Sequence, residues 1–492
     1  MPSQISNIKQ KVIVHHNGTD KAAHSVASSP AESSDRFLHV LITAPETSLN
    51  LCKTILSLTV LRYPPPTLLN FRHSYRNSNE TWAELSVRSA NEWMRNKKSL
   101  KDEDLVLLVN EDGAWFQLPP STVIGRFKSL TEQLNENLRA QYGTITGGSD
   151  NSRVSRYTQK ILFGADKVCN SATNLQADLA CAAVPESPLP EDSWGPQTDK
   201  DSQGSHNRPR YLHPRTVIGR AGPLKEFYGY AINLIAEQKL DADYVFSTIF
   251  GEQEYQREKW RSTQSTPWST WLGDKLGSSK TPNISNLHMD VKLGQDYEYG
   301  IGLDYSSTLF FTLSRSIKDA EWIQFNDTEG LKTLQERHNI PKPKPVTMPL
   351  DLQRTKSPFY RRQAGDETKS PMEENFDLPD PKSLDWSNLM LAINAHSKKV
   401  SPLLVLEGED EEHIGNWWSQ LWFHPWAKAL LQKAIDEPPA LLYRDRTAFL
   451  TGSQPEAIMS PTPEEYGGAW IDNGKWLSWD KLCSAYEDEI FA

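Results

Sequence analysis

The hydrophobic pattern of the chain is organised around an unbroken apolar run, Leu105–Val109. Such a run is typical of a strand that is buried on both faces of an α/β sheet. It ends abruptly in the polar turn Asn110-Glu111-Asp112-Gly113. Ligands of open α/β sheets bind just beyond the carboxyl ends of the strands, and short oxygen side chains there suit a divalent cation and phosphate. A strand that simply ends in a polar turn explains the same spacing.

The segments before this run alternate between strand and helix periods. Residues 37–42 predict a strand, and residues 49–56 predict a helix that Ser48 is placed to cap. Residues 67–71 predict a second strand and residues 82–93 a second helix. This alternation predicts a doubly wound α/β fold with a parallel sheet.

The same mixture continues to residue 327. Further strands or core segments are predicted at 160–165, which ends in Asp166, and at 210–219 and 300–312. Further helices are predicted at 123–138, capped by Ser121, and at 224–235. Residues 244–250 are predicted to be buried, with residues 251–254 at a helix end.

Composition divides the 492 residues into four predicted regions. Residues 1–35 are polar and predict a disordered tail. Residues 36–327 form the α/β domain, and residues 328–385, rich in Pro, Lys and Asp, are the best linker candidate. Residues 386–492 hold eight of the 16 Trp. Several of these Trp stand at helical spacing, so packing on the main domain is their default explanation.

The charge and the hydropathy of the chain argue against nucleic acid and against a membrane span, respectively. The formal charge of −10 leaves no basic surface for nucleic acid. Residues 1–35 contain no apolar run that would serve as a signal or a membrane span, which predicts a cytoplasmic protein without a transmembrane segment.

Cysteine spacing leaves the redox compartment open. No CxxC pair is present, so a structural zinc site is not expected. Cys169 and Cys181 are close enough to pair in an oxidising lumen, and a reduced pair in the cytosol is equally allowed. Sequons stand at Asn17, Asn79, Asn283 and Asn326, and they matter only in the secretory pathway.

Several short stretches form a combination that is more specific than any one of them. They are Leu68–Asn70, Leu105–Pro120, Phe163–Cys169, Ala180–Pro185, Arg210–Leu212, Val217–Gly219, Ile249–Glu258, Gly302–Tyr305 and Trp417–Phe423. The combination resembles a fungal family of glycosyltransferase-like proteins, which is distantly similar to the glycosyltransferase domain of procollagen lysyl hydroxylases. The resemblance implies a GT-A fold, a Rossmann-type mixed sheet with flanking helices. It also implies a nucleotide-sugar donor, an acceptor of unknown identity and, if the protein is active, Mn²⁺ or Mg²⁺.

The chain departs from the pattern of this family at the acidic turn. The family has Asp where this chain has Asn110 and Gly113, while Glu111 and Asp112 are acidic but displaced. Adjacent residues of a strand point to opposite faces, so a shift of one residue does not simply replace a ligand. In a turn the rule is looser, and Asp112 remains able to reach a metal.

Three further elements also depart from the family. His213-Pro214 replaces an Asn and Gly near the sugar, and Asp243 stands one residue later than the family's acid. Ahead of the double Trp, Leu406–Glu412 is acidic where the family has a metal-binding His and a Lys that meets the diphosphate. The residue types of that missing motif occur instead at His15–Lys21, near the start of the sequence. A chance occurrence is the simpler explanation for this segment.

The resemblance implies a set of candidate site residues. They are Glu111 and Asp112 at the metal, Asp243 and Asp304 as catalytic groups, and Asn110, Asp166, His213, Glu252 and Gln253 at the bound donor. A solvated loop acid, or a cap in the case of Asp304, is the alternative for each carboxylate.

Three functions remain open at this point. The first is an active glycosyltransferase with a rearranged site, and the second is a catalytically silent relative that serves as a binding or accessory protein. The third is an interaction protein whose Trp-rich region docks a partner, which exposed Trp would favour. The resemblance also implies the secretory pathway or Golgi, against the cytoplasmic expectation above. The oligomeric state is not readable.

Overall fold

The computed structural model describes most of the chain after residue 35. The described residues are 36–72, 80–110, 113–147, 152–169, 178–238, 240–264, 282–340, 345–359, 378–380, 383–406, 416–436, 442–444, 457–459 and 465–492. The predicted tail, the acidic pair Glu111 and Asp112, and most of the acidic segment Leu406–Glu412 lie outside these ranges.

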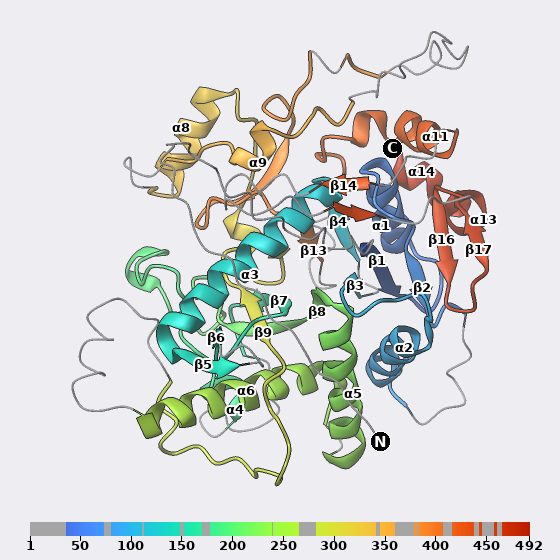
Figure 1. The fold of residues 1–492 in the computed structure, drawn as a ribbon. Helices are drawn as coiled ribbons and strands as arrows, with labels where there is room; N and C mark the ends of the chain where they lie inside the picture. The colour runs from blue at the N-terminus through green and yellow to red at the C-terminus, as the bar shows by residue number, and fades with distance from the viewer. Residues whose placement is uncertain are drawn as a thin grey trace, which may run out of the picture. The chain divides into compact units, whose positions relative to one another are not determined.

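A large mixed sheet with flanking helices forms the centre of the fold (Figure 1). Its strands, in spatial order, are β17 (Trp476–Ser478), β16 (Gly468–Ile471), β2 (Thr67–Leu69), β1 (Arg36–Thr43), β3 (Leu105–Val109), β8 (Tyr211–Arg220), β7 (Ile161–Asp166) and β9 (Ile301–Asp304). β15 (Ala457–Met459) pairs in parallel with the first residues of β1, and β14 (Leu442–Arg444) pairs antiparallel with β15.

Strand directions bring several carboxyl ends to one edge of this sheet. β1 runs parallel to β2 and β3, while β8 is antiparallel to both of its neighbours, β3 and β7. β9 is parallel to β7, so β1, β2, β3, β7 and β9 all end at the same edge. The predicted central strand is therefore confirmed, but its partner β8 makes the sheet mixed rather than wholly parallel.

β3 is buried on both faces, as its apolar run predicts. Leu105, Leu107 and Val109 belong to one hydrophobic core, and Val106 and Leu108 belong to the other. The alternation follows from the two-residue period of a strand. α1 (Leu49–Val60) packs in the first core, whereas α2 (Trp82–Asn96), α5 (Ala221–Gln238) and α6 (Ala242–Gln264) pack in the second.

Helix starts and stops agree only in part with the predictions. Ser48 caps α1, since its hydroxyl accepts the backbone N–H of Leu51 over 3.1 Å. The predicted cap Ser121 is wrong, because α3 (Pro120–Tyr142) begins one residue earlier without a side-chain cap. Proline at the first helical position has no N–H that needs a partner, and its φ is already helical.

The predicted helix end at residues 251–254 is also wrong, because these residues lie inside α6. Gly251 does not end the helix, but allows α6 to pack closely against a neighbouring segment. A Cβ at this position would lie 2.4 Å from the carbonyl of Leu179, at the start of α4 (Leu179–Ala182). Glycine thus lets two helix backbones approach closely, a use that the sequence alone does not separate from a stop signal.

A smaller sheet joins distant parts of the chain. It contains β10 (Phe310–Thr312), β13 (Leu403–Val405) and β4 (Ala114–Phe116) in that order. β4 follows β3 and β10 follows β9, so both chain segments leave the main sheet at its carboxyl edge and meet β13.

The remaining elements are short. They are β5 (Thr144–Gly147), β6 (Ser152–Ser155), β11 (Ala320–Ile323), β12 (Leu391–Asn394), α8 (Thr328–Arg337), α9 (Leu350–Gln353), α11 (Ala427–Asp436), α13 (Trp479–Cys483) and α14 (Glu487–Ile490). α8 and α9 lie within the range expected as a linker. In the part of the chain that the structure describes, no helix is both long and apolar enough to span a membrane.

The Trp-rich region packs into the first core. Trp418 is 2% and Trp422 3% exposed, and their indole N–H groups donate to the carbonyls of Ile490 and Gln117 over 2.8 and 2.9 Å. None of the described Trp is among the exposed large hydrophobic residues. This burial weakens the interpretation of the region as a docking surface and supports the packing explanation.

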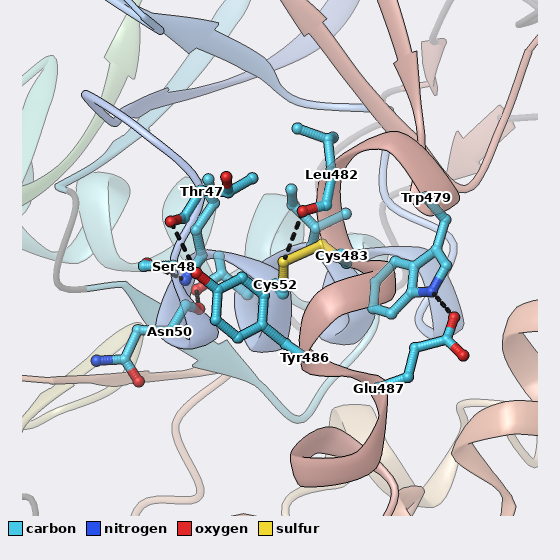
Figure 2. Close-up of a disulfide and its surroundings, with 12 residues drawn as sticks. Thr47, Ser48, Asn50, Cys52, Trp479, Leu482, Cys483, Tyr486 and Glu487 are labelled. Atoms are coloured by element: carbon cyan, nitrogen blue, oxygen red, sulfur yellow. Dashed lines mark hydrogen bonds between the residues drawn. A yellow bond between two sulfur atoms is a disulfide. The ribbon is translucent and has the colours of Figure 1, made fainter.

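A disulfide fastens α1 to the C-terminal region (Figure 2). Cys52 of α1 is bonded to Cys483, the last residue of α13, across 431 positions of sequence. Beside it, the hydroxyl of Tyr486 donates to the carbonyl of Thr47 over 3.1 Å. Sequence spacing carried no signal for this pair, because residues so far apart become neighbours only through the fold.

A second disulfide settles the question left open for Cys169 and Cys181. These residues are bonded in the structure and are 12 positions apart. The bond ties the segment after β7 to α4, so each cysteine of the chain has a partner.

We expect the double change Cys52→Ala and Cys483→Ala to lower the free energy of unfolding by about 2–5 kcal/mol, because the long crosslink restricts the unfolded chain. The matched pair Cys169→Ala and Cys181→Ala opens a loop of only 12 positions and should cost less. Urea unfolding under non-reducing conditions measures both. Equal losses in the two double variants would contradict the prediction.

Candidate functional site

The carboxyl edge of the main sheet gathers several of the residues predicted from sequence. Asn110 directly follows β3, Asp166 ends β7 and Asp304 ends β9. His213 stands on β8 opposite Gly164, next to the same edge. The apolar runs predicted strands that end before Asn110 and in Asp166, and the structure has both strand ends. The position of Asp304 and His213 at the same edge comes from the fold.

A pocket of about 100 Å³ opens at this edge, where the ends of β1 and β3 face residues of β8 and of the helices α2, α5 and α6. We name it the pocket between β1 and β3. The chain passes from β1 to β2 on one side and returns to β3 on the other, so this is the topological switch point of the parallel strands. Ligands of doubly wound sheets bind at such points. Its lining includes Thr43, Trp82, Ser86, Asn110, Arg215 and Tyr228.

Asn110 is held firmly in the wall of this pocket. The hydroxyl of Thr43 donates to its Oδ1 over 2.9 Å, and its backbone N–H donates to the carbonyl of Arg215 over 3.0 Å. The turn then closes at Gly113, whose φ of +86° is unfavourable for other residues. A Cβ there would lie 2.6 Å from Oγ1 of Thr54, so Gly113 rests directly on α1.

Asp304 is buried and organises the turn between β9 and β10. Its carboxylate accepts the backbone N–H groups of Thr308, Leu309 and Phe310 over 2.9, 2.6 and 3.0 Å. Burial raises the pKa of this carboxyl group, and the three N–H groups act in the opposite direction. This arrangement is the capping alternative considered for Asp304, applied to a turn rather than a helix.

Asp166 also bonds to the backbone that follows it. Its Oδ1 accepts from the backbone N–H groups of Lys167 and Val168 over 2.6 and 3.4 Å. The neighbouring Lys167 is buried, with Nζ 2.5 Å from Oδ2 of Asp319 and 4.5 Å from the ring centroid of Trp194. Burial lowers the pKa of Lys167, while Asp319 raises it. This part of the edge is therefore a closed ionic cluster.

Two predicted residues of α6 lie elsewhere. The side-chain amide of Gln253 donates to the carbonyl of Ile301 over 3.0 Å and accepts its N–H over 2.9 Å. Ile301 begins β9, so Gln253 stands at the amino end of that strand, away from the pocket. Glu252 accepts the hydroxyl of Tyr230 over 3.0 Å, and burial raises its pKa to about 7. Asp243 is the second residue of α6, and its side chain lies outside the described atoms.

A second cavity of about 110 Å³ lies between α3 and α6. Glu254 and Arg257 line it, but Arg257 is already bonded to Glu254 over 2.7 Å and to Glu298 over 2.5 Å. Burial raises the pKa of Glu254, and Arg257 opposes that rise. The charges of this cavity are thus mutually satisfied, which is typical of a structural ion pair.

Sequence reasoning missed the cations of the site region. Arg215 lines the pocket. The guanidinium of Arg126 donates to the carboxylate of Asp351 over 2.6 Å and to the carbonyl of Thr308 over 3.0 Å. Arg126 therefore helps to hold the turn that Asp304 organises. Its partners lie 182 and 225 positions away, so no local pattern identifies it.

The described residues do not by themselves assemble a site for Mn²⁺ or Mg²⁺. Among them, no group of three or more His, Cys, Asp or Glu is placed to hold a metal ion. At the carboxyl edge, Asp166 and Asp304 both accept backbone N–H groups. The proposed ligands Glu111 and Asp112 fall outside the described ranges.

Comparison with known proteins adds no assignment. No protein-family model matches the chain, and no curated protein matches it significantly.

We expect Asp304→Ala to lower the free energy of unfolding by about 2–5 kcal/mol, because it leaves the buried N–H groups of Leu309 and Phe310 without an acceptor. The control Asp290→Ala, at a fully exposed side chain, should change it by less than about 0.5 kcal/mol. Urea unfolding measures both. Unchanged stability with lost activity would return Asp304 to the catalytic role implied by the resemblance.

The raised pKa of Glu252 predicts a pH-dependent stability. Between pH 4.5 and about 7 the folded protein binds more protons at Glu252 than the unfolded chain, so stability falls as pH rises. Glu252→Gln should remove about 2–3 kcal/mol of that fall, whereas the exposed control Glu329→Gln should keep it. Urea unfolding at pH 5 and pH 7.5 measures the difference. An identical slope in wild type and Glu252→Gln would refute it.

Proposed function

We propose that this protein has a GT-A-type fold and binds a nucleotide-sugar at the pocket between β1 and β3, as a glycosyltransferase or as a descendant of one. The observation that carries the proposal is the pocket at the topological switch point, at the end of the strand that the resemblance to the glycosyltransferase-like family includes. Fold and pocket position support donor binding, and they do not by themselves establish transfer.

The pocket lining supplies the chemistry that a nucleoside diphosphate needs. Trp82 offers aromatic surface for a base, and Arg215 offers a permanent positive charge for a diphosphate. Thr43 and Asn110 add hydroxyl and amide groups for the ribose or the sugar. Arg215 is the one cationic residue among the described residues that line the pocket, so we assign it the role of binding the diphosphate.

A metal enters this proposal only through two residues that lie outside the described ranges. Glu111 and Asp112 follow Asn110 directly and are the carboxylates that we propose for Mn²⁺ or Mg²⁺. A bound divalent cation would neutralise diphosphate charge.

The runner-up is a catalytically silent relative that keeps donor binding as a binding or accessory protein. Asn110 favours it, because an amide stands where the related family has an acid and its Oδ1 already accepts the Thr43 hydroxyl. A neutral amide holds a divalent cation less strongly than a carboxylate. The two functions share the pocket and differ in whether sugar leaves the donor.

Calorimetric titration with UDP-sugars, with and without Mn²⁺, tests both functions. We expect binding at the wild-type pocket and an affinity at least about tenfold lower in Arg215→Ala, because a charge-assisted contact to the diphosphate is lost. Asn416→Ala, an exposed position outside the pocket, is the control.

Release of UDP then separates the alternatives. Binding with Mn²⁺-dependent UDP release would support the transferase, whereas binding without release would support the silent relative. No binding at millimolar UDP-sugar would contradict the proposed donor site. Thermal melting of each variant shows whether a loss of affinity reflects the site or the fold.

A further inference from the structure

The disulfides indicate where this chain folds. All four cysteines are paired, and Cys52 and Cys483 are both fully buried in the first core. In forming each bond, two thiols lose two protons and two electrons, and an oxidant protein that carries a disulfide is reduced to a dithiol. Such bonds persist in oxidising compartments and are rare where thiols are kept reduced. Pairing of every cysteine is therefore typical of a protein of the secretory pathway.

In that compartment the sequons acquire a meaning. Those at Asn17 and Asn79 lie outside the described residues, and those at Asn283 and Asn326 lie within them. A glycan acceptor must be exposed, together with the hydroxyl residue two positions later.

Asn283 meets this requirement in the segment that precedes β9. Both Asn283 and Ser285 are exposed, and Oδ1 of Asn283 accepts the backbone N–H of Ser285 over 3.1 Å. The hydroxyl residue of the sequon is thereby held beside the acceptor amide. The residue between them, Ile284, packs against a small apolar cluster and fixes the segment to the body of the protein.

Asn326, just before the start of α8, meets the same requirement of exposure. Asn326 and Thr328 are exposed, and the backbone N–H of Asn326 donates to the carbonyl of Ser387 over 3.0 Å. Asp327 between them caps the helix by accepting the N–H of Gly330 over 2.9 Å. Neither acceptor lines the pocket between β1 and β3, so a glycan at either position is compatible with donor binding.

We propose that Asn283 and Asn326 are N-glycosylation sites of a chain that matures in an oxidising compartment. The transfer forms a bond from Nδ2 of the asparagine to the first carbon of an oligosaccharide. It breaks the bond from that carbon to the diphosphate of a lipid-linked donor, and one proton leaves with the lipid diphosphate. This inference goes beyond the proposed function and does not depend on it.

Peptide mapping of the full chain, produced in eukaryotic cells and purified with a thiol-blocking reagent, tests the proposal. Deglycosylation by peptide N-glycosidase in ¹⁸O-water should convert Asn283 and Asn326 to ¹⁸O-labelled aspartate. The same map should show Cys52 linked to Cys483 and Cys169 linked to Cys181. Unlabelled asparagine at both positions would overturn the proposal, whether the cysteines are linked or blocked as thiols.

Matched variants separate a loss of the acceptor motif from a loss of the fold. Ser285→Ala and Thr328→Ala should each abolish labelling at their own asparagine. Ser285→Thr and Thr328→Ser keep the hydroxyl and should retain it. Labelling that survives in the alanine variants would refute the assignment of that site. UDP-sugar binding plays no part in this readout, so its outcome is independent of the donor-site experiment.

Discussion

The burial of α1 from Leu51 to Val60 is the constraint on which the rest of the structure depends. Every residue of Leu51–Val60 is buried, including polar ones, because the sheet covers one side and the C-terminal region covers the other. Its hydroxyl groups are satisfied within the helix, since Thr54, Ser57 and Thr59 donate to backbone carbonyls of the preceding turn. A helix whose side chains are buried on every side is stable only when other elements enclose it.

This constraint also links the candidate site to the C-terminal region. Gly113, just before β4, rests on α1, and α1 is enclosed by α11, α13 and α14. The indole N–H of Trp422 donates to the carbonyl of Gln117, just after β4. The pocket between β1 and β3 therefore depends on residues that follow it by more than 300 positions.

Local patterns predict the elements of this fold better than its long-range connections. The strand Leu105–Val109 with Asn110 after it, the strand that ends in Asp166 and the helix cap at Ser48 follow from short periodic signals. The roles of Gln253 and Arg126 do not, because their partners belong to remote segments. Gly251 misled the prediction since close helix packing and helix termination both use glycine.

The bond between Cys52 and Cys483 has a consequence for biosynthesis. A ribosome makes Cys52 early and Cys483 431 residues later, an interval of roughly 20–90 s at about 5–20 residues per second. Throughout that interval α1 lacks the elements that finally enclose it, and its apolar surface is open to chaperones or to aggregation. The enclosure of α1 therefore waits until the segment of α13 and α14 has been synthesised, and a nascent chain that stalls before this segment cannot mature.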